Sequence, residues 1–405
     1  MPVDKHTPEM TEAERERALA AARELSREFD AAAQRADEEK RFAAELVPLY
    51  KESGLVTVAV PKKYGGQGAD ILTTALVGRE LAKGDPASAL AYNMHQAMVG
   101  IFRGTDALDE PARERLFTRM VEEKLLLCGP FSEMRAGLSG LADTVAVPDG
   151  RGGWRLSGRK NWATLIEGAD LISLNATITD EDGRLPEDYK EHAQRETTFI
   201  IPADAPGVSI DYTWDTLGMR GSGTQTLVLD QVYAGPEAYA GNFRQGLIGE
   251  AEWAALLFSG VYLGLADRAY EEARRILSKK HLGATLGGND TAVKDLGYVQ
   301  HGLGRMHSEI AVAERVMEAT AAMVIDGRHA DKDALRRKTI WDLTKVTTTE
   351  AAIRVTDLAL RLVGGQAFRR GHVLERLFRD SRAGYLHSFG TDQLYDTVGR
   401  LELNS

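Results

Sequence analysis

Cysteine is nearly absent from this sequence: Cys128 is the single cysteine among 405 residues. One cysteine excludes an intramolecular disulfide and a metal cluster built from several cysteines, and we predict no metal site. No run of about 18 apolar residues occurs, so we predict no membrane-spanning helix. Acidic residues outnumber basic ones by 60 to 50, and the net charge of -10 disfavours nucleic acid as a partner.

The opening stretch, MPVDKHTPEMTEAERERAL, lacks the apolar core of a secretion signal. Together with the single cysteine, this favours a reducing compartment, and we expect a cytoplasmic location. Hydrophobic residues make up 43% of the chain and charged residues 27%, as in an ordinary globular protein. The length of 405 residues is enough for roughly two or three domains.

Three blocks with different hydrophobic periods follow one another along the chain. Residues 1–126 repeat apolar side chains at helical spacing, and Thr11 with Glu14 fits a capping box. Residues 127–240 are short stretches rich in β-branched and aromatic side chains, and helical spacing returns over 241–405. We therefore predict an α+β multi-domain fold: an N-terminal α-helical domain, a middle antiparallel β domain resembling a barrel, and a C-terminal four-helix bundle.

Local signals refine this division. Asp85 stands between two helical stretches, where its side chain is expected to cap the second helix. The sequence DGRGG at 149–153 separates two strand-like stretches and is a hairpin turn signal. The polar stretch 181–196 is expected to be a loop between strands.

The stretch 363–400 carries the most specific signals in the chain. Paired glycines, Gly364 and Gly365, follow a helical stretch, and such a pair lets the backbone approach a ligand closely and direct N–H groups at a phosphate. A charged helical segment, ERLFRD, comes next, and then Gly390 and Thr391. As it stands, GG…ER..RD…GT resembles the C-terminal signature of the acyl-CoA dehydrogenase superfamily of flavoproteins.

This resemblance covers nearly the whole chain, because helices, a β domain and a helical bundle in this order are the architecture of that superfamily. It implies FAD as the cofactor, and a homodimer or homotetramer with FAD in the subunit interface. We interpret the charged residues of ERLFRD as a structural ion-pair network rather than a catalytic group: Glu375, Arg376, Arg379 and Asp380.

Other motifs of the superfamily supply the expected ligand contacts. FSEMRAG (131–137) resembles the segment that meets the flavin pyrimidine edge. SGRKNWAT (157–164) resembles a strand whose tryptophan packs on the isoalloxazine and whose threonine bonds near N5, and GMRGSGT (218–224) resembles a strand beside flavin and substrate. In both strands alternate side chains are expected to share one face. The resemblance implies cofactor contacts from Ser132, Glu133, Gly137, Trp162, Thr164, Gln300, Gly364, Gly365 and Thr391, and substrate contacts from Arg220 and Ser222.

The usual catalytic base of the superfamily is missing. Many members carry a glutamate just before the Gly-Thr pair, and this chain has Phe389 there. Members that place the base and a CoA-binding arginine on the helix from about 249 would have them near Ala254 and Ala255, where this chain has no polar group. His387 and Asp392 are the nearby candidates for the base, and Asp392 also suits the N-terminal charge of a helix.

Glu250 and Glu252 lie up to about a turn before the alanines and would serve as a base only after a register shift. Our first interpretation is α,β-dehydrogenation of an acyl thioester, with hydride transfer to flavin N5 and a displaced base. Its partners would be acyl-CoA or another small molecule, and electron-transfer flavoprotein as acceptor.

The alternative is a flavin-dependent monooxygenase or oxidase on the same fold. Reduced flavin, supplied by a partner reductase, reacts there with oxygen at C4a, and no base for an α-proton is needed. Loss of both the glutamate and the CoA-binding arginine favours this alternative, whereas the retained signature and the Trp–Thr pair favour the dehydrogenase. A flavin-binding scaffold without activity is the third interpretation.

Overall fold

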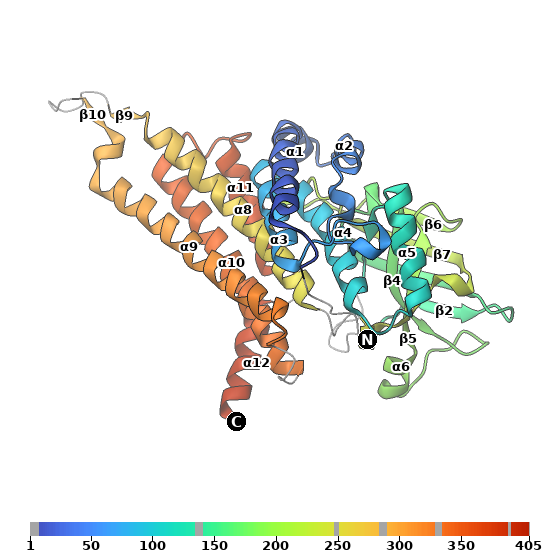
Figure 1. Ribbon diagram of the computed structural model, residues 1–405. Helices are drawn as coiled ribbons and strands as arrows, with labels where there is room; N and C mark the ends of the chain where they lie inside the picture. The colour runs from blue at the N-terminus through green and yellow to red at the C-terminus, as the bar shows by residue number, and fades with distance from the viewer. Residues whose placement is uncertain are drawn as a thin grey trace.

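The computed structural model describes residues 8–133, 141–246, 251–282, 290–328, 334–387 and 390–404. Its elements fall into three parts in chain order, as Figure 1 shows: helices, a sheet, and a set of long helices. The predicted α+β fold is therefore confirmed. Among the described residues, no helix is both long enough and apolar enough to cross a membrane.

Capping side chains set the starts of the N-terminal helices. The helices of this part are α1 (Glu12–Glu39), α2 (Leu46–Glu52), η1 (Leu55–Thr57), η2 (Lys62–Tyr64), α3 (Ile71–Gly84), α4 (Pro86–Gly104) and α5 (Glu110–Glu123). Thr11 forms a capping box with Glu14 at the start of α1, and the Asp85 carboxylate accepts the Ser88 N–H at the start of α4. Both predicted caps are thus confirmed.

The middle part is one twisted sheet. Its strands are β1 (Leu127–Cys128), β2 (Val145–Pro148), β3 (Trp154–Ala163), β4 (Leu171–Ile178), β5 (Glu196–Pro202), β6 (Val208–Asp211), β7 (Gln225–Ala234) and β8 (Tyr239–Asn242). The strand order is β6-β7-β3-β2-β4-β5-β8, with β1 also beside β4. The pairings are antiparallel except that β1 and β2 run parallel to β4, so the sheet is mixed rather than purely antiparallel.

Two local predictions for this part have different outcomes. The hairpin at DGRGG is confirmed, because the Asp149 carboxylate accepts the N–H groups of Arg151 and Gly153 between β2 and β3. The stretch 181–196 is not only loop, since it contains the short helix α6 (Tyr189–Arg195), which has no buried residue. Short 3-10 turns complete the part: η3 (Ile166–Gly168) and η4 (Pro236–Ala238).

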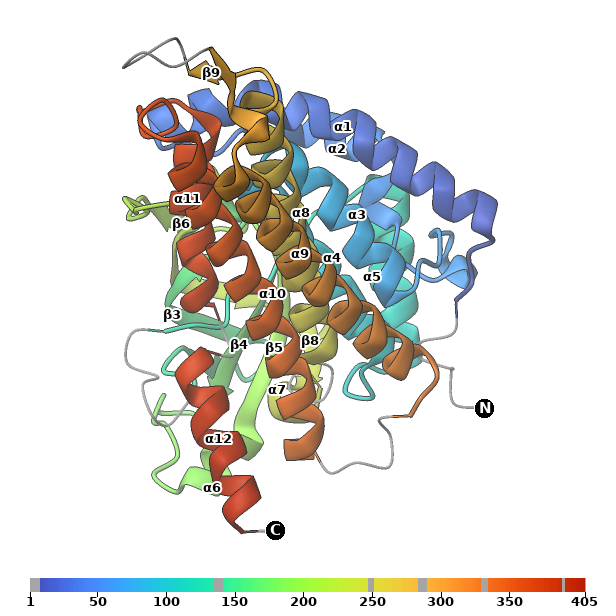
Figure 2. The ribbon, with the colours of Figure 1, turned by 90° about the vertical axis from the view of Figure 1, so that its left-hand side faces the viewer.

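The long helix α8 joins the N-terminal helices to the C-terminal bundle. The elements here are α7 (Phe243–Gly246), α8 (Ala251–Leu277), β9 (His281–Leu282), β10 (Thr291–Ala292), η6 (Val293–Asp295), α9 (Gly297–Ile325), α10 (Ala334–Val363), α11 (Val373–Ser381), η7 (Arg382–Tyr385) and α12 (Thr391–Leu403). Helix α8 packs against α3, α4, α9 and α10 (Figure 2). A Cβ at Gly260 would lie 2.2 Å from the Ala75 carbonyl oxygen, so glycine permits the close approach of α8 to α3.

Candidate functional site

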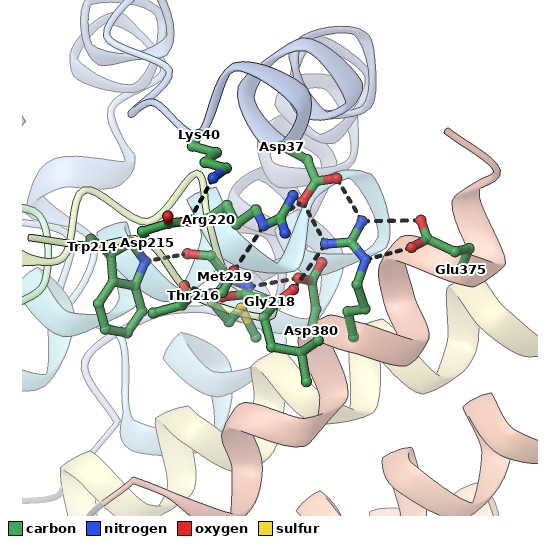
Figure 3. A network of polar contacts seen from close by, with 12 residues as sticks. Asp37, Lys40, Trp214, Asp215, Thr216, Gly218, Met219, Arg220, Glu375 and Asp380 are labelled. Carbon is green, nitrogen blue, oxygen red and sulfur yellow. Dashed lines mark hydrogen bonds and ion pairs between the residues drawn. The ribbon is translucent and has the colours of Figure 1, made fainter. Parts of the chain in front are cut away.

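Arg379 ties together three segments that are far apart in the sequence, and Figure 3 labels its partners Asp37 and Glu375. Its guanidinium donates to both carboxylate oxygens of Asp37 in α1, at 2.8 and 2.6 Å, and to both oxygens of Glu375 in α11, at 2.6 and 3.0 Å. It also donates to the Leu217 carbonyl, at 3.1 Å, in the loop before β7. The interpretation of Glu375 and Arg379 as a structural ion-pair network is confirmed, and the network joins all three parts of the fold.

The next residue, Asp380, holds the peptide of Met219. The Met219 N–H donates to Asp380 Oδ1 at 2.6 Å, and the Met219 carbonyl accepts from Trp214 Nε1 at 2.9 Å (Figure 3). Burial and the nearby Asp85 carboxyl raise the pKa of Asp380 to about 7. Met219 has a φ of 53°, a left-handed conformation that is uncommon for residues other than glycine. Contacts at both the N–H and the carbonyl of Met219 therefore hold this strained loop in place.

Three hydroxyl groups form a hydrogen-bonded chain that starts at the Met219 carbonyl. Ser222 Oγ donates to that carbonyl at 2.7 Å and lies 2.6 Å from Thr224 Oγ1. Thr224 Oγ1 in turn donates to Thr164 Oγ1 at 3.0 Å, just beyond the end of β3. Ser222 is 0% exposed and Thr224 is 4% exposed, whereas Thr164 is only partly buried. The chain of hydroxyls therefore runs from the interior to a residue at the surface of the site.

Trp162, two residues before Thr164, is 63% exposed and has a φ of 54°. An exposed tryptophan in a strained conformation is favourable only where something else requires it, and a planar ligand is such a requirement. The positive φ breaks the strand alternation, so the prediction that Trp162 and Thr164 share a strand face is wrong. The Asn161 N–H donates to the Ser132 carbonyl at 2.8 Å, which places Ser132 beside this strand end.

The predicted substrate residues occupy a turn and not a strand, because β7 begins only at Gln225. The expected alternation on one face is therefore wrong. Arg220 Nε donates to the Thr216 carbonyl at 2.9 Å and lies 4.0 Å from Asp37. Ser222 belongs to the buried hydroxyl chain. Arg220 and Ser222 therefore have different partners, and both side chains make contacts within the protein.

Glu133 uses its carboxylate inside the protein. Oε1 accepts from Lys160 Nζ at 2.5 Å and from Thr144 Oγ1 at 2.6 Å, and Oε2 accepts the Asp143 N–H at 2.5 Å. The Lys160 side chain is 0% exposed and that of Glu133 is 3% exposed. Lys160 Nζ also donates to Asn175, at 2.7 Å. Glu133 is therefore half of a buried ion pair that fixes the chain next to Ser132. The predicted contact at Gly137 lies outside the described residues.

The C-terminal candidates fall into two groups, one before α11 in the chain and one after it. Gly364, with a φ of 81°, ends α10, and a Cβ on Gly364 or Gly365 would meet nothing within 4 Å. Lys280 Nζ lies close by and donates to the Val363 carbonyl at 3.0 Å. Thr391 lies beyond α11 at the start of α12, and its buried hydroxyl has no hydrogen-bond partner among the described residues.

Gln300, the remaining cofactor candidate, lies near the start of α9. Its side chain is exposed and donates to the Lys294 carbonyl at 3.2 Å. No described contact joins it to the other candidates of its own chain. Its predicted role in cofactor binding would therefore involve a second subunit.

The two candidate bases have unfavourable surroundings. His387 stacks on Phe258, with ring centroids 4.6 Å apart, and its Nε2 lies 2.9 Å from the Tyr262 hydroxyl. Burial, reinforced by the buried Lys345 cation, lowers the pKa of His387 to about 3. Asp392 is exposed in the first turn of α12, where its charge favours the helix start. Phe389 lies outside the described residues.

Sequence reasoning missed two residues on which this geometry depends. Asp37 lies in an N-terminal helix of ordinary amphipathic pattern, and nothing local marks it as the partner of Arg379. Lys160 had a detectable signal, because it is a charged residue inside a stretch predicted to be a strand. The structure shows that it is buried there, where a charge is unusual.

Comparison with known proteins identifies the family. The families described as the N-terminal, middle and C-terminal domains of acyl-CoA dehydrogenase match residues 11–122, 131–232 and 256–391 of this chain. L-evernosamine nitrososynthase from a Micromonospora species is 30% identical over 363 residues, covering 85% of this chain and 79% of that protein. The chain therefore belongs to the acyl-CoA dehydrogenase superfamily of flavin-dependent enzymes, as the sequence signature predicted.

Solved structures share the fold at lower identity. Butyryl-CoA dehydrogenase from Megasphaera elsdenii has a TM-score of 0.83 at 20% identity, covering 97% of this chain and 99% of that one. FMN-bound TdsC from Paenibacillus sp. A11-2 also has a TM-score of 0.83, at 22% identity, covering 96% and 97%. Because a dehydrogenase and a monooxygenase match equally well, the fold does not distinguish the two reactions.

Proposed function

We propose that this protein is a flavin-dependent monooxygenase that receives reduced flavin from a partner reductase. The observation that carries the proposal is that neither of the two predicted bases, His387 and Asp392, has surroundings that suit a base. A pKa of about 3 for His387, against a value near 7 for an effective base, weakens its hold on a proton by roughly 5 kcal/mol. Asp392 is exposed to solvent in the first turn of α12, where its charge favours the start of the helix.

The residues at the end of β3 fit a flavin. Trp162 offers an exposed aromatic face, and the Thr164 hydroxyl offers a group that either donates or accepts a hydrogen bond. A bound flavin would supply the redox chemistry and, when reduced, activate oxygen. The chain itself would orient the ring through Trp162 and Thr164, and the buried Glu133–Lys160 pair would fix the adjoining segment at Ser132.

We propose FAD as the form of the flavin. Gly364 and Gly365 leave open space beside Lys280, which suits a pyrophosphate. FAD lies in the subunit interface in the superfamily, so we propose that the glycine pair and Thr391 contact the nucleotide there.

A homodimer or homotetramer follows from that placement. Large apolar side chains of the bundle support an interface, including Tyr298 and Val312 on α9, each 62% exposed, and Tyr395 on α12, 56% exposed. Light scattering coupled to size-exclusion chromatography measures the mass directly. A monomer of 44.3 kDa that retains bound FAD would contradict this part of the proposal.

Relatives of both chemical types exist, and they suggest the substrates to test. The 30% identical relative is a nitrososynthase, and TdsC is a dibenzothiophene monooxygenase. Both names imply oxidation of a nitrogen or sulfur centre in a small molecule. We therefore propose an electron-rich heteroatom in a small molecule as the reacting centre.

Dehydrogenation of an acyl thioester is the second candidate, and one observation favours it. Glu252, in the first turn of α8, is only 2% exposed, so a carboxyl is buried on the helix that carries the base in some superfamily members. This residue would act only if the helix places it against the α-carbon of the substrate. Substitution E252Q with acyl-CoA substrates tests that role.

The test of the proposed function supplies reduced FAD or FMN from a separate NADH-dependent flavin reductase in air. Candidate substrates are amino sugars, dibenzothiophene and acyl-CoAs, and products are analysed by mass spectrometry. A product heavier by one oxygen atom, formed only with both protein and oxygen, supports the monooxygenase. Its absence, together with an enoyl product from an acyl-CoA, would overturn the proposal in favour of dehydrogenation.

A further inference from the structure

The hydroxyls of Ser222, Thr224 and Thr164 form an unbroken chain that ends at the site, and we call it the hydroxyl relay. The distances along it are 2.7 Å from the Met219 carbonyl to Ser222, 2.6 Å to Thr224 and 3.0 Å to Thr164. Each hydroxyl has one hydrogen to donate and lone pairs to accept. The orientations of the three hydrogens are therefore coupled.

Two orderings of the hydrogens are available to the relay. In the first, the Thr164 hydroxyl rotates so that Thr164 donates to Thr224, Thr224 to Ser222, and Ser222 to the Met219 carbonyl, and Thr164 presents only an acceptor to the site. In the second, Thr224 donates to Thr164, as in the structure, and Ser222 turns from the Met219 carbonyl to donate to Thr224, which leaves the Thr164 hydrogen free to point into the site.

The far end of the relay is built to permit both orderings. The Met219 carbonyl also accepts from Trp214 Nε1 at 2.9 Å, so it stays bonded when Ser222 turns away. Asp380 accepts the N–H of the same residue, Met219, at 2.6 Å on the preceding peptide. Met219 is thus held in place while the direction of donation along the hydroxyls can reverse.

We propose that the hydroxyl relay lets Thr164 change from hydrogen-bond donor to acceptor when a bound flavin is reduced, with Thr224 and Ser222 as its positioning residues. The nitrogen N5 of a flavin is a bare acceptor in the oxidised ring and carries a hydrogen in the reduced ring. The second ordering therefore matches oxidised flavin, and the first matches reduced flavin. This inference rests on flavin binding at Thr164 and Trp162, and it does not depend on which substrate is oxidised.

Removal of the Thr224 hydroxyl should weaken the binding of reduced and oxidised flavin by different amounts. In T224V the Thr164 hydrogen loses its acceptor in the first ordering, whereas the second ordering loses only a donor to Thr164. Leaving a donor unsatisfied costs more than leaving an acceptor short of one bond. Binding of reduced flavin should therefore weaken more than binding of oxidised flavin. S222A should act in the same direction, because Thr224 then loses its own acceptor.

The test measures dissociation constants for oxidised FMN and FAD, and for the same flavins reduced anaerobically with dithionite. We expect the ratio of the reduced to the oxidised constant to rise by about 2- to 10-fold in T224V, the range for loss of one hydrogen bond. T224S keeps the hydroxyl and should retain the wild-type ratio. T198V is the matched control, since Thr198 is a buried threonine of β5 whose hydroxyl has no partner among the described residues.

An unchanged ratio in both T224V and S222A would overturn the relay, and so would opposite shifts in the two variants or an equal shift in T198V. Circular dichroism establishes that each variant is folded, and S222A tests the relay independently if T224V does not fold. If the wild type binds flavin but the variants keep its ratio, only this inference is overturned. If the variants shift the ratio as expected but the wild type oxygenates no substrate, only the proposed function is overturned.

Discussion

The buried pair of Glu133 and Lys160 makes a quantitative prediction about stability. K160M replaces the ammonium by an apolar group of similar length and leaves Glu133 without its cation. The Glu133 side chain is 3% exposed, so water does not replace the lost partner. Breaking a buried ion pair from one side costs roughly 3–5 kcal/mol.

The local contacts place the expected loss at the lower end of that range. After the substitution, Glu133 keeps three donors: the N–H and hydroxyl of Thr144 and the N–H of Asp143. We therefore expect K160M to lower the free energy of unfolding by about 3 kcal/mol at pH 8.

Urea denaturation followed by far-UV circular dichroism measures this loss. The double variant E133Q/K160M removes both charges and should recover part of the stability. R119M is the control, because its pair with Glu123 is exposed on both sides, and it should change stability by less than about 1 kcal/mol. A K160M protein within about 1 kcal/mol of the wild type at pH 8 would refute the reasoning.

Further predictions concern the interdomain loop, the nucleotide end of the site and the pH dependence. G218A should destabilise the protein by about 1–3 kcal/mol in thermal denaturation, because its Cβ would lie 2.5 Å from the Arg379 carbonyl oxygen. G365A meets no atom within 4 Å, so it should leave stability unchanged but weaken FAD binding more than FMN binding; equal effects on both flavins would exclude a pyrophosphate contact there. The folded pKa of Asp380, about 7, exceeds its unfolded value, so its contribution to stability is present in acid and lost as the pH rises through 7. The melting temperature of D380N should accordingly fall less than that of the wild type between pH 5 and 8, and parallel curves would contradict this. H387Q should not alter the shape of the pH–activity profile between about pH 5 and 9, because His387 is neutral throughout that range.

Signals that act within one element were readable from the sequence. The capping residues Thr11 and Asp85 and the turn DGRGG each depend on neighbours within a few positions, and all three predictions are confirmed. The order of motifs along the chain likewise led to the correct superfamily, because the order survives even where single residues have changed.

Features that depend on distant partners were not readable in this way. The parallel pairing of β1 and β2 with β4 joins strands without a sequence signal for direction. Helix α6 has no buried face, so its sequence carries no hydrophobic stripe. The alternation predicted for Trp162 and Thr164 failed because a positive φ at Trp162 interrupts the strand, and such strain is set by tertiary contacts rather than by the residue type.

Anaerobic mixing of the flavin-loaded protein with acyl-CoAs of several chain lengths tests the central claim most directly. The central claim is that neither predicted base, His387 with its pKa of about 3 or the exposed Asp392, removes an α-proton. It predicts that the visible absorbance of the oxidised flavin stays unchanged with every acyl-CoA. Rapid bleaching of the flavin by any one of them would contradict the account and establish a dehydrogenase.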